Sequence, residues 1–396
     1  MIPQLITTLL TLGLASAAPS NTMPRQGTVV ARQLIIGAPY QILTAEYDGS
    51  SFSITGSNDT VGSAPSWLRF REPNLVYAVN ENSNNLNLFT LNGSSGGVSF
   101  VDSATGSSGV VFLEFNGDQS RMVGAAYGNG TVDVWDTTAT DAAPKLIKTI
   151  TVTGPLGPDQ TSHHPHQALL DPTGRYFIIP NLGGDAVLIL DGKDDLFEIT
   201  GSVSVASGSG PRHGGFIKSG DAYFYVVACE LSSEVILFSM QYNSDNLTLT
   251  EVQKQSTYGA AFPPANASSA AAGELAVASN QKDVYISNRL SGNATDSIAH
   301  FVFNGAGTDG KATLQFADTV SSGGILPRMF SLGMDNEQTI FVANQAGDNG
   351  LVALKRSNDT GSLDPTPLAT MPSASLVAPE LAATPSMGPQ FVSEIC

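Results

Sequence analysis

The side chains in this chain that could do chemistry stand at a few separated points, and the densest group is imidazole. The chain has 396 residues and five histidines, and three of these, His163, His164 and His166, lie in "TSHHPHQALLDP" just before an apolar run. Imidazole can ligate a metal or transfer a proton near neutral pH. One short loop seldom presents three imidazoles correctly to a single ion, and no acidic residue is adjacent. We therefore expect no metal, with His163 and His164 as loop residues and His166 as the functional one.

Four charged residues at a distance from this loop have the types that an anion site needs. Arg212 lies in "GSGPRHGG", Glu230 follows "YFYVVAC", Arg289 follows "DVYISN", and Arg328 lies in "LPRMF". Guanidinium groups bind carboxylate and phosphate through paired hydrogen bonds, and a carboxylate or imidazole beside them can transfer a proton. Each arginine could instead hold a structural salt bridge, because acidic residues outnumber basic ones.

The elements that must position these residues are short strands. Helical periodicity is nearly absent, and runs of Val, Ile, Phe and Tyr are bounded by Gly, Asn, Asp and Ser, which is typical of antiparallel strands. The runs recur as a unit of strand, turn, strand, turn and strand. The six units of this kind begin at Trp67, Val111, His166, Arg212, Gly273 and Arg328. A partial unit from Gln33 lacks its first strand, and a strand from the C-terminal region could complete it.

Seven such units predict an all-β fold, a seven-bladed β-propeller, because each small sheet must bury both faces against its neighbours. We place this domain at residues 33–363 and expect the Ala/Pro/Ser-rich tail, residues 364–396, to be irregular or packed on the propeller. In a propeller, His166, Arg212 and Arg328 stand at the starts of first strands. Glu230 and Arg289 stand at the ends of second strands, where other units carry the asparagines Asn80, Asn181 and Asn344. All should converge near the central axis.

Five segments in this order resemble the seven-bladed lactonase family, which includes bacterial-type 6-phosphogluconolactonase and fungal carboxy-cis,cis-muconate cyclase. The segments are "HPHQALLDPTGRYFIIPNLGGD", "GSGPRHGGF", "YFYVVACELSSEVILFSM", "DVYISNRL" and "LPRMFSLGMDNEQTIFVANQ". The resemblance covers roughly residues 33 to 363. It implies an active set of His166, Arg212, Glu230 and Arg289, further substrate-binding positions at Arg328 and Gln345, and no metal or other cofactor.

These residue types indicate a lactone hydrolase or a lactonising cyclase that acts on an anionic sugar-acid lactone or a muconate-type dicarboxylate. Arg212 and Arg289 would bind the anion and stabilise developing charge, and His166 and Glu230 would transfer protons, with the base left open between them. No nucleophilic serine in a Gly-x-Ser-x-Gly elbow is apparent, which disfavours an acyl-enzyme route. The alternative is a non-catalytic propeller that serves as an extracellular adhesin, antigen or binding module.

Several features predict an exported glycoprotein. Residues 1–18 have an apolar core and a small-residue end, as a secretory signal peptide does. No later stretch is long enough to span a membrane as a helix. The acceptor pattern Asn-x-Ser/Thr for N-glycans occurs at Asn58, Asn92, Asn129, Asn246, Asn266, Asn293 and Asn358. The predicted location is extracellular or on the cell surface.

Charge and cysteine content add two expectations. A formal net charge of -17 would repel nucleic acid, which is therefore not an expected partner. The two cysteines, Cys229 and Cys396, could pair in an oxidising compartment, or Cys229 could be a buried thiol. The sequence leaves both possibilities open, and it leaves the oligomeric state open as well.

Overall fold

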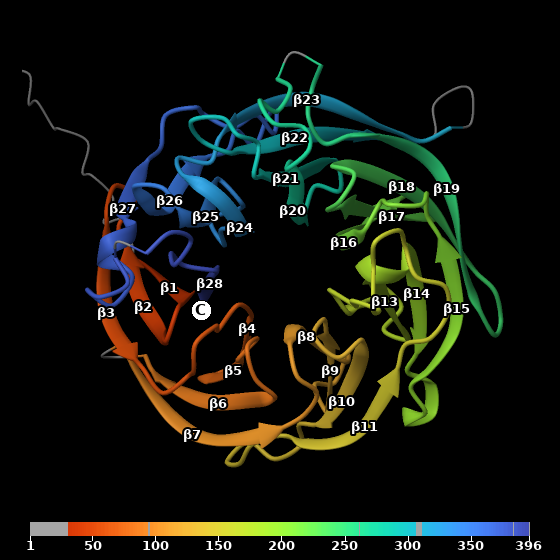
Figure 1. Cartoon of the computed structure of the whole chain (residues 1–396), viewed down its shortest axis with the longest axis horizontal. Helices are drawn as coiled ribbons and strands as arrows, with labels where there is room; N and C mark the ends of the chain where they lie inside the picture. The colour runs from red at the N-terminus through yellow and green to blue at the C-terminus, as the bar shows by residue number, and fades with distance from the viewer. Residues whose placement is uncertain (1–30, 94–95, 261, 306–310, 383, 396) are drawn as a thin grey trace, which may run out of the picture. The chain divides into compact units, whose positions relative to one another are not determined.

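The apolar runs form seven four-stranded antiparallel sheets arranged around a central axis (Figure 1) in the residues that the structure describes. This computed structural model describes residues 31–93, 96–260, 262–305, 311–382 and 384–395. Helical structure in these ranges is confined to three short 3-10 turns, η1 (Leu182–Gly184), η2 (Lys193–Asp195) and η3 (Ser373–Ser375). The predicted all-β, seven-bladed propeller is confirmed.

We number the blades in chain order and name the strands from the axis outwards. Blade 1 contains β4 (Leu68–Arg71), β5 (Leu75–Val79), β6 (Asn85–Asn92) and β7 (Gly97–Thr105); blade 2 contains β8 (Val110–Phe115), β9 (Arg121–Ala126), β10 (Thr131–Asp136) and β11 (Lys145–Thr151). Blade 3 contains β12 (Leu169–Leu170), β13 (Tyr176–Asn181), β14 (Ala186–Asp191) and β15 (Glu198–Ser204); blade 4 contains β16 (Pro211–Ser219), β17 (Ala222–Cys229), β18 (Glu234–Tyr242) and β19 (Leu247–Ser256). Blade 5 contains β20 (Ala271–Val277), β21 (Asp283–Arg289), β22 (Ser297–Asn304) and β23 (Thr313–Ser321); blade 6 contains β24 (Ile325–Leu332), β25 (Thr339–Ala346), β26 (Asn349–Lys355) and β27 (Ala369–Pro372). Blade 7 contains β28 (Phe391–Ile395), β1 (Arg32–Ala38), β2 (Gln41–Tyr47) and β3 (Phe52–Asn58).

Blade 7 joins the two ends of the propeller. Strand β28 pairs with β1 in an antiparallel register that sets Gln33 opposite Ile395 and Gly37 opposite Phe391. This is the C-terminal strand that the partial unit from Gln33 required. The propeller therefore extends past 363, and the tail supplies both β27 and β28. Of the two alternatives given for the tail, packing on the propeller describes β27 and β28. The free edges of β26 and β1 provide the backbone partners of these two strands.

The apolar core lies between neighbouring blades. Second and third strands are buried on both faces, so β5 reads "LVYAV" and β13 reads "YFIIPN" without polar alternation. Outer strands such as β11 and β15 alternate exposed and partly buried residues along their length. One cluster packs Val123 of blade 2 against Phe177 and Ile179 of blade 3, and comparable clusters fill the other gaps. Interlocked blades hold the inner strands rigidly around the axis.

β-Bulges interrupt the innermost strands near the axis. In β16 the register shifts between Pro211 and His213, and in β24 it shifts between Pro327 and Met329. A further shift in β20 lies between Ala272 and Leu275. A bulge inserts an extra residue and changes the direction of its side chain. These three shifts fall at Arg212, Arg328 and Glu274.

The structure does not test the predictions of export and of cysteine pairing. Residues 1–18 and Cys396 lie outside the described residues, while Cys229 is a buried free thiol in the structure. Six of the seven glycan-acceptor asparagines are exposed, whereas Asn58 is partly buried and its Nδ2 donates to the Val98 carbonyl oxygen at 3.0 Å. In the described part of the chain, no helix combines the length and apolarity that a bilayer crossing requires.

Candidate active site

Five of the six predicted catalytic and substrate-binding residues line one cavity near the axis. The cavity has a volume of about 200 Å³, and its described lining consists of Glu81, Tyr127, His166, Arg212, Glu230, Arg289 and Arg328. The lining is almost entirely polar and charged. The sequence-based expectation that these side chains converge therefore matches their placement in the structure.

Antiparallel pairing explains why residues so far apart in sequence meet. The start of an innermost strand lies beside the end of the next strand outwards, as Pro211 lies opposite Cys229 in blade 4. Arg212 and Glu230 therefore approach the cavity from adjacent strands of a single blade. Arg289, the last residue of β21, reaches the cavity from the same end of blade 5.

The charged groups form a compact set of ion pairs. Glu230 Oε2 lies 2.8 Å from Arg212 Nε and 3.0 Å from Arg289 Nη2. Across the cavity, Arg328 Nη2 lies 2.5 Å from Glu81 Oε2. Three guanidinium groups thus face two carboxylates. Arg212 Nη1 is buried and has no hydrogen-bond partner among the described residues.

His166 is buried and uncharged at neutral pH. Its relative exposure is 6%, and burial, with added repulsion from Arg212, holds the pKa of its imidazole well below 6.5. Its Nδ1 lies 3.0 Å from His213 Nε2. A neutral imidazole on the wall of a cationic cavity can accept a proton, and this ability is what a general base requires.

Glu230 has a different electrostatic setting. Burial raises the pKa of its carboxyl group, but Arg289 and Arg212 more than offset that effect and leave the pKa below its ordinary value. Burial and the neighbouring Arg289 lower the pKa of Arg212 to about 10, so its guanidinium stays charged at neutral pH. Glu230 is therefore a carboxylate already occupied by two cations, and it is a weaker base than an unpaired carboxylate would be.

Sequence reasoning missed two residues of the cavity and two behind its wall. Glu81 and Tyr127 follow the second strands β5 and β9 by a residue or two, the same place that Glu230 occupies after β17. The recurring asparagine at that level drew attention to Asn80 instead of its neighbour. His213 and Glu274 lie behind His166 and contact each other. Glu274 carried a signal, because it is an acid within the apolar run "GELAV".

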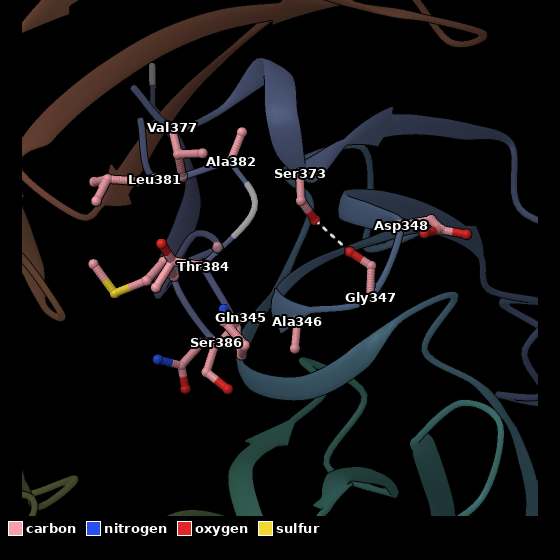
Figure 2. Close-up of a pocket in the computed structure, with 13 residues that line it drawn as sticks. Gln345, Ala346, Gly347, Asp348, Ser373, Val377, Leu381, Ala382, Thr384 and Ser386 are labelled. Atoms are coloured by element: carbon pink, nitrogen blue, oxygen red, sulfur yellow. Dashed lines mark hydrogen bonds between the residues drawn. The ribbon is translucent and has the colours of Figure 1, made fainter. Parts of the chain in front are cut away.

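Gln345 does not reach this cavity. It lines a separate pocket of about 320 Å³ between the β25–β26 turn and the chain segment that leads to β28 (Figure 2). The backbone closes this contact tightly, since Gly388 N–H donates to the Gln345 carbonyl oxygen at 2.7 Å. Sequence alone could not separate the two places, because Gln345 also stands near the end of a second strand.

The two other histidines of the loop are held by protein groups. The His164 ring stacks on Tyr127 with 4.1 Å between centroids, and its Nδ1 lies 2.7 Å from the Tyr127 carbonyl oxygen. His163 Nδ1 lies 3.0 Å from Asn181 Nδ2. In the described ranges, no three His, Cys, Asp or Glu side chains are grouped as metal ligands. His166 alone of the three histidines lines the cavity.

The fold and the site together define a seven-bladed propeller with an arginine-lined cavity near its axis. The family model described as "Lactonase, 7-bladed beta-propeller" matches residues 30–379. The chain belongs to this lactonase family.

Curated relatives carry names consistent with the family. A "probable 6-phosphogluconolactonase" of Arthroderma benhamiae is 33% identical over 258 residues, which cover 63% of this chain and 64% of that protein. The 6-phosphogluconolactonase of Bacillus subtilis is 31% identical over 249 residues, 62% of this chain and 66% of the relative. The matched segment thus spans slightly less than two thirds of each relative. Among solved structures, a periplasmic gluconolactonase of Pseudomonas aeruginosa aligns with a TM-score of 0.75 and 21% identity, covering 93% of this chain and 99% of that one, which supports the fold.

Proposed function

We propose that this protein hydrolyses a small lactone that carries one anionic group, such as a sugar-acid lactone. The observation that carries the proposal is the pairing of a neutral, buried imidazole with an excess of guanidinium charge in a single cavity. Family membership and the names of the relatives support the same reaction class. A volume of about 200 Å³ suits a single sugar-sized ring.

The charge balance of the cavity indicates the charge of its ligand. Arg212, Arg289 and Arg328 face Glu230 and Glu81, which leaves one positive charge uncompensated while His166 is neutral. Such a site attracts one carboxylate or phosphate group, or the oxyanion that forms during hydrolysis. This balance favours a monoanionic lactone over a muconate-type substrate with several carboxylates.

The geometry supports direct attack by water. His166 takes a proton from water, the water oxygen forms a bond to the lactone carbonyl carbon, and the carbonyl oxygen becomes an oxyanion. Arg212 and Arg289 stabilise that oxyanion with hydrogen bonds and charge. The ring C–O bond then breaks, the alkoxide takes the proton back from His166, and a hydroxy acid leaves. The described lining contains no serine, threonine or cysteine, so this scheme needs no acyl-enzyme.

Glu230 then acts chiefly by holding the two arginines. Its Oε2 forms ion pairs with both guanidinium groups, and in this proposal those ion pairs hold the arginines beside the cavity. His166 is the better base, because no cation neutralises its lone pair. We place the reaction outside the cell and expect N-glycans on the exposed acceptor asparagines, as the first residues and the acceptor pattern of the sequence predict.

A substrate panel tests the proposal. Purified protein is assayed by pH-stat with gluconolactone, 6-phosphogluconolactone, cellobionolactone and a muconolactone, and carboxymuconate cyclisation is followed by absorbance. We expect acid release to be faster with an anionic monocyclic lactone than with gluconolactone, and to be lost in His166→Gln. Cyclisation without lactone hydrolysis would replace the proposal with the cyclase reaction. Tight lactone binding with no turnover would indicate a binding module.

A further inference from the structure

A line of hydrogen bonds runs from the cavity into the centre of the propeller. His166 Nδ1 lies 3.0 Å from His213 Nε2, and His213 Nδ1 lies 2.9 Å from Glu274 Oε1. All three residues are buried, with relative exposures of 6%, 2% and 5%. They come from blades 3, 4 and 5, so no single blade builds the line. The reaction scheme above uses only its first member.

Donor and acceptor roles along this line follow from its inner end. Glu274 Oε1 also lies 3.0 Å from the Leu275 backbone nitrogen, which can only donate. This oxygen accepts the Leu275 hydrogen, and we assign the hydrogen of its second contact to His213 Nδ1. A neutral His213 then has a free lone pair at Nε2, which accepts from His166 Nδ1–H. Because a neutral imidazole carries one N–H, His166 with its hydrogen on Nδ1 has its lone pair at Nε2.

The surroundings of His213 disfavour its charged form. Burial lowers the pKa of His213 below its ordinary value despite the opposing effect of Glu274. A small cavity of about 10 Å³ adjoins the line, room for about one water molecule, and Trp67, Arg212 and Glu274 are among its lining residues. Trp67 Nε1 and Arg212 Nη1 are buried donors without a hydrogen-bond partner among the described residues, and Glu274 Oε2 is a buried acceptor in the same condition.

Packing holds the middle ring in place. His213 lies edge-on to Trp67 and to Phe112, with 5.6 Å between centroids in both cases. The bulges of β16 and β20 fall at Arg212 and Glu274, and each bulge changes the direction of nearby side chains. The arrangement thus fixes both the position and the rotation of the two imidazoles.

We propose that His213 and Glu274 are positioning residues that hold His166 as the Nδ1–H tautomer, with its Nε2 lone pair available as the base in the cavity. This inference rests on the proposed lactone hydrolysis for its kinetic consequence. Its structural consequence, the tautomer of His166, can be measured without any substrate. The kinetic consequence concerns the turnover rate, whereas the structural consequence concerns the protonation of His166 in the free protein.

The structural test uses ¹⁵N-histidine labelling and NMR at a pH where His166 is neutral. The chain has five histidines, so assignment by single substitutions is practical. We expect His166 Nδ1 to be protonated and Nε2 to be unprotonated in the parent protein. In Glu274→Met, which lacks the acceptor, we expect a mixture of His166 tautomers. In Glu274→Gln the amide oxygen can still accept from His213 and Leu275, and we expect the Nδ1–H form to return. A parent protein with His166 protonated at Nε2, or no change in Glu274→Met, overturns the proposal.

The kinetic test compares two matched histidine substitutions. His213→Phe keeps an aromatic ring beside Trp67 but removes both hydrogen bonds. His300→Phe is the control, since His300 is also fully buried, stacks on Tyr285 at 5.0 Å and bonds to Asp283 at 3.1 Å in a cluster remote from the cavity lining.

We expect His213→Phe to lower kcat by about 10²-fold, the usual loss for a misplaced general base, with little change in KM. His300→Phe should leave both constants within about twofold of the parent values. Equal kcat in the two variants contradicts the positioning role. If the parent protein turns over no lactone, the proposed function fails, and the NMR result still decides the tautomer claim.

Discussion

Two buried clusters of arginine, histidine and carboxylate lie in this propeller, and they differ in charge balance. In the outer cluster of blades 5 and 6, Asp283 binds His300 through one oxygen and Arg356 through the other, and Arg356 Nε donates to the Tyr285 hydroxyl at 2.7 Å. In the cavity cluster, three arginines share two carboxylates and Arg212 Nη1 has no hydrogen-bond partner among the described residues. In the outer cluster Asp283 uses both of its oxygens on cationic partners, whereas the cavity cluster has one more guanidinium group than carboxylates.

The pKa values of the histidines in the two clusters shift in opposite directions. Burial alone would lower the pKa of His300, but hydrogen bonds that its ring donates to Asp283 and Asp318 raise that pKa above 6.5. Burial and the neighbouring Arg212 hold the pKa of His166 well below 6.5. Buried ionic groups therefore do not by themselves identify a site. The proposed site rests instead on an uncompensated positive charge beside a neutral imidazole on a cavity wall.

The largest expected difference between the clusters concerns the base. His166→Gln should lower kcat by about 10²- to 10⁴-fold, because the scheme then lacks a group to deprotonate water. His300→Gln should leave kcat unchanged and lower the melting temperature. Steady-state kinetics and calorimetry on both variants check this prediction. Full activity in His166→Gln would move the base elsewhere.

Removing one arginine from each cluster should separate catalysis from stability. Arg212→Met should raise KM and lower kcat, by about 10²-fold in kcat for one lost oxyanion donor. Its unfolding free energy should change by only about 1 kcal/mol, since Glu230 keeps Arg289 and excess positive charge is relieved. Arg356→Met should lower the unfolding free energy by about 3 kcal/mol and leave kcat unchanged. Denaturant unfolding gives the energies, and a stability loss shared equally by both variants would refute the contrast.

Glu230→Gln tests whether the carboxylate of the cavity holds arginines or transfers protons. We expect kcat to fall by about tenfold, less than in His166→Gln, because the amide keeps the shape of the side chain and its oxygen can accept from a guanidinium group. KM for an anionic lactone should not rise, since the cavity becomes more positive. If Glu230→Gln loses more activity than His166→Gln, then Glu230 is the base.

The smallest expected effect is a pair of opposite pH dependences. The pKa of His300 is raised in the folded protein, so protonation of this imidazole stabilises the fold. The contribution is fully present below pH 6.5 and is lost as the pH rises through the folded pKa. The lowered pKa of His166 has the opposite effect on stability. Below pH 6.5 the unfolded chain binds a proton at this residue that the native protein does not bind, so the fold loses stability as the pH falls. Each substitution to Phe should remove its own slope, by about 2 °C in melting temperature between pH 5 and 8. Calorimetry across that range measures both slopes, and slopes of the same sign would contradict the assignment.

The sequence predicted five residues of the cavity lining and missed the two buried residues behind its wall, His213 and Glu274. Arg212 was found because the starts of other first strands also carry a cation or an imidazole. Glu230 and Arg289 were found because they are charged residues at positions where other repeats carry asparagine. Glu81 was missed because a recurring asparagine beside it drew the comparison to the wrong position. His213 was not among the predicted site residues, although it directly follows Arg212. Residues adjacent in a strand normally point to opposite faces. The bulge at Arg212 breaks that rule, and both side chains lie beside the small inner cavity.

The sequence by itself determined the blade count, the closing role of a C-terminal strand and the end of the propeller where charged residues gather. It could do so because apolar periodicity and turn residues are local signals that repeat along the chain. The tertiary structure decided which residues share the cavity, which cations lie beside Glu230, and where Gln345 lies. Those outcomes depend on the register of each bulged strand, on pairing between distant blades and on burial, and all three arise only when the sheets pack around one axis.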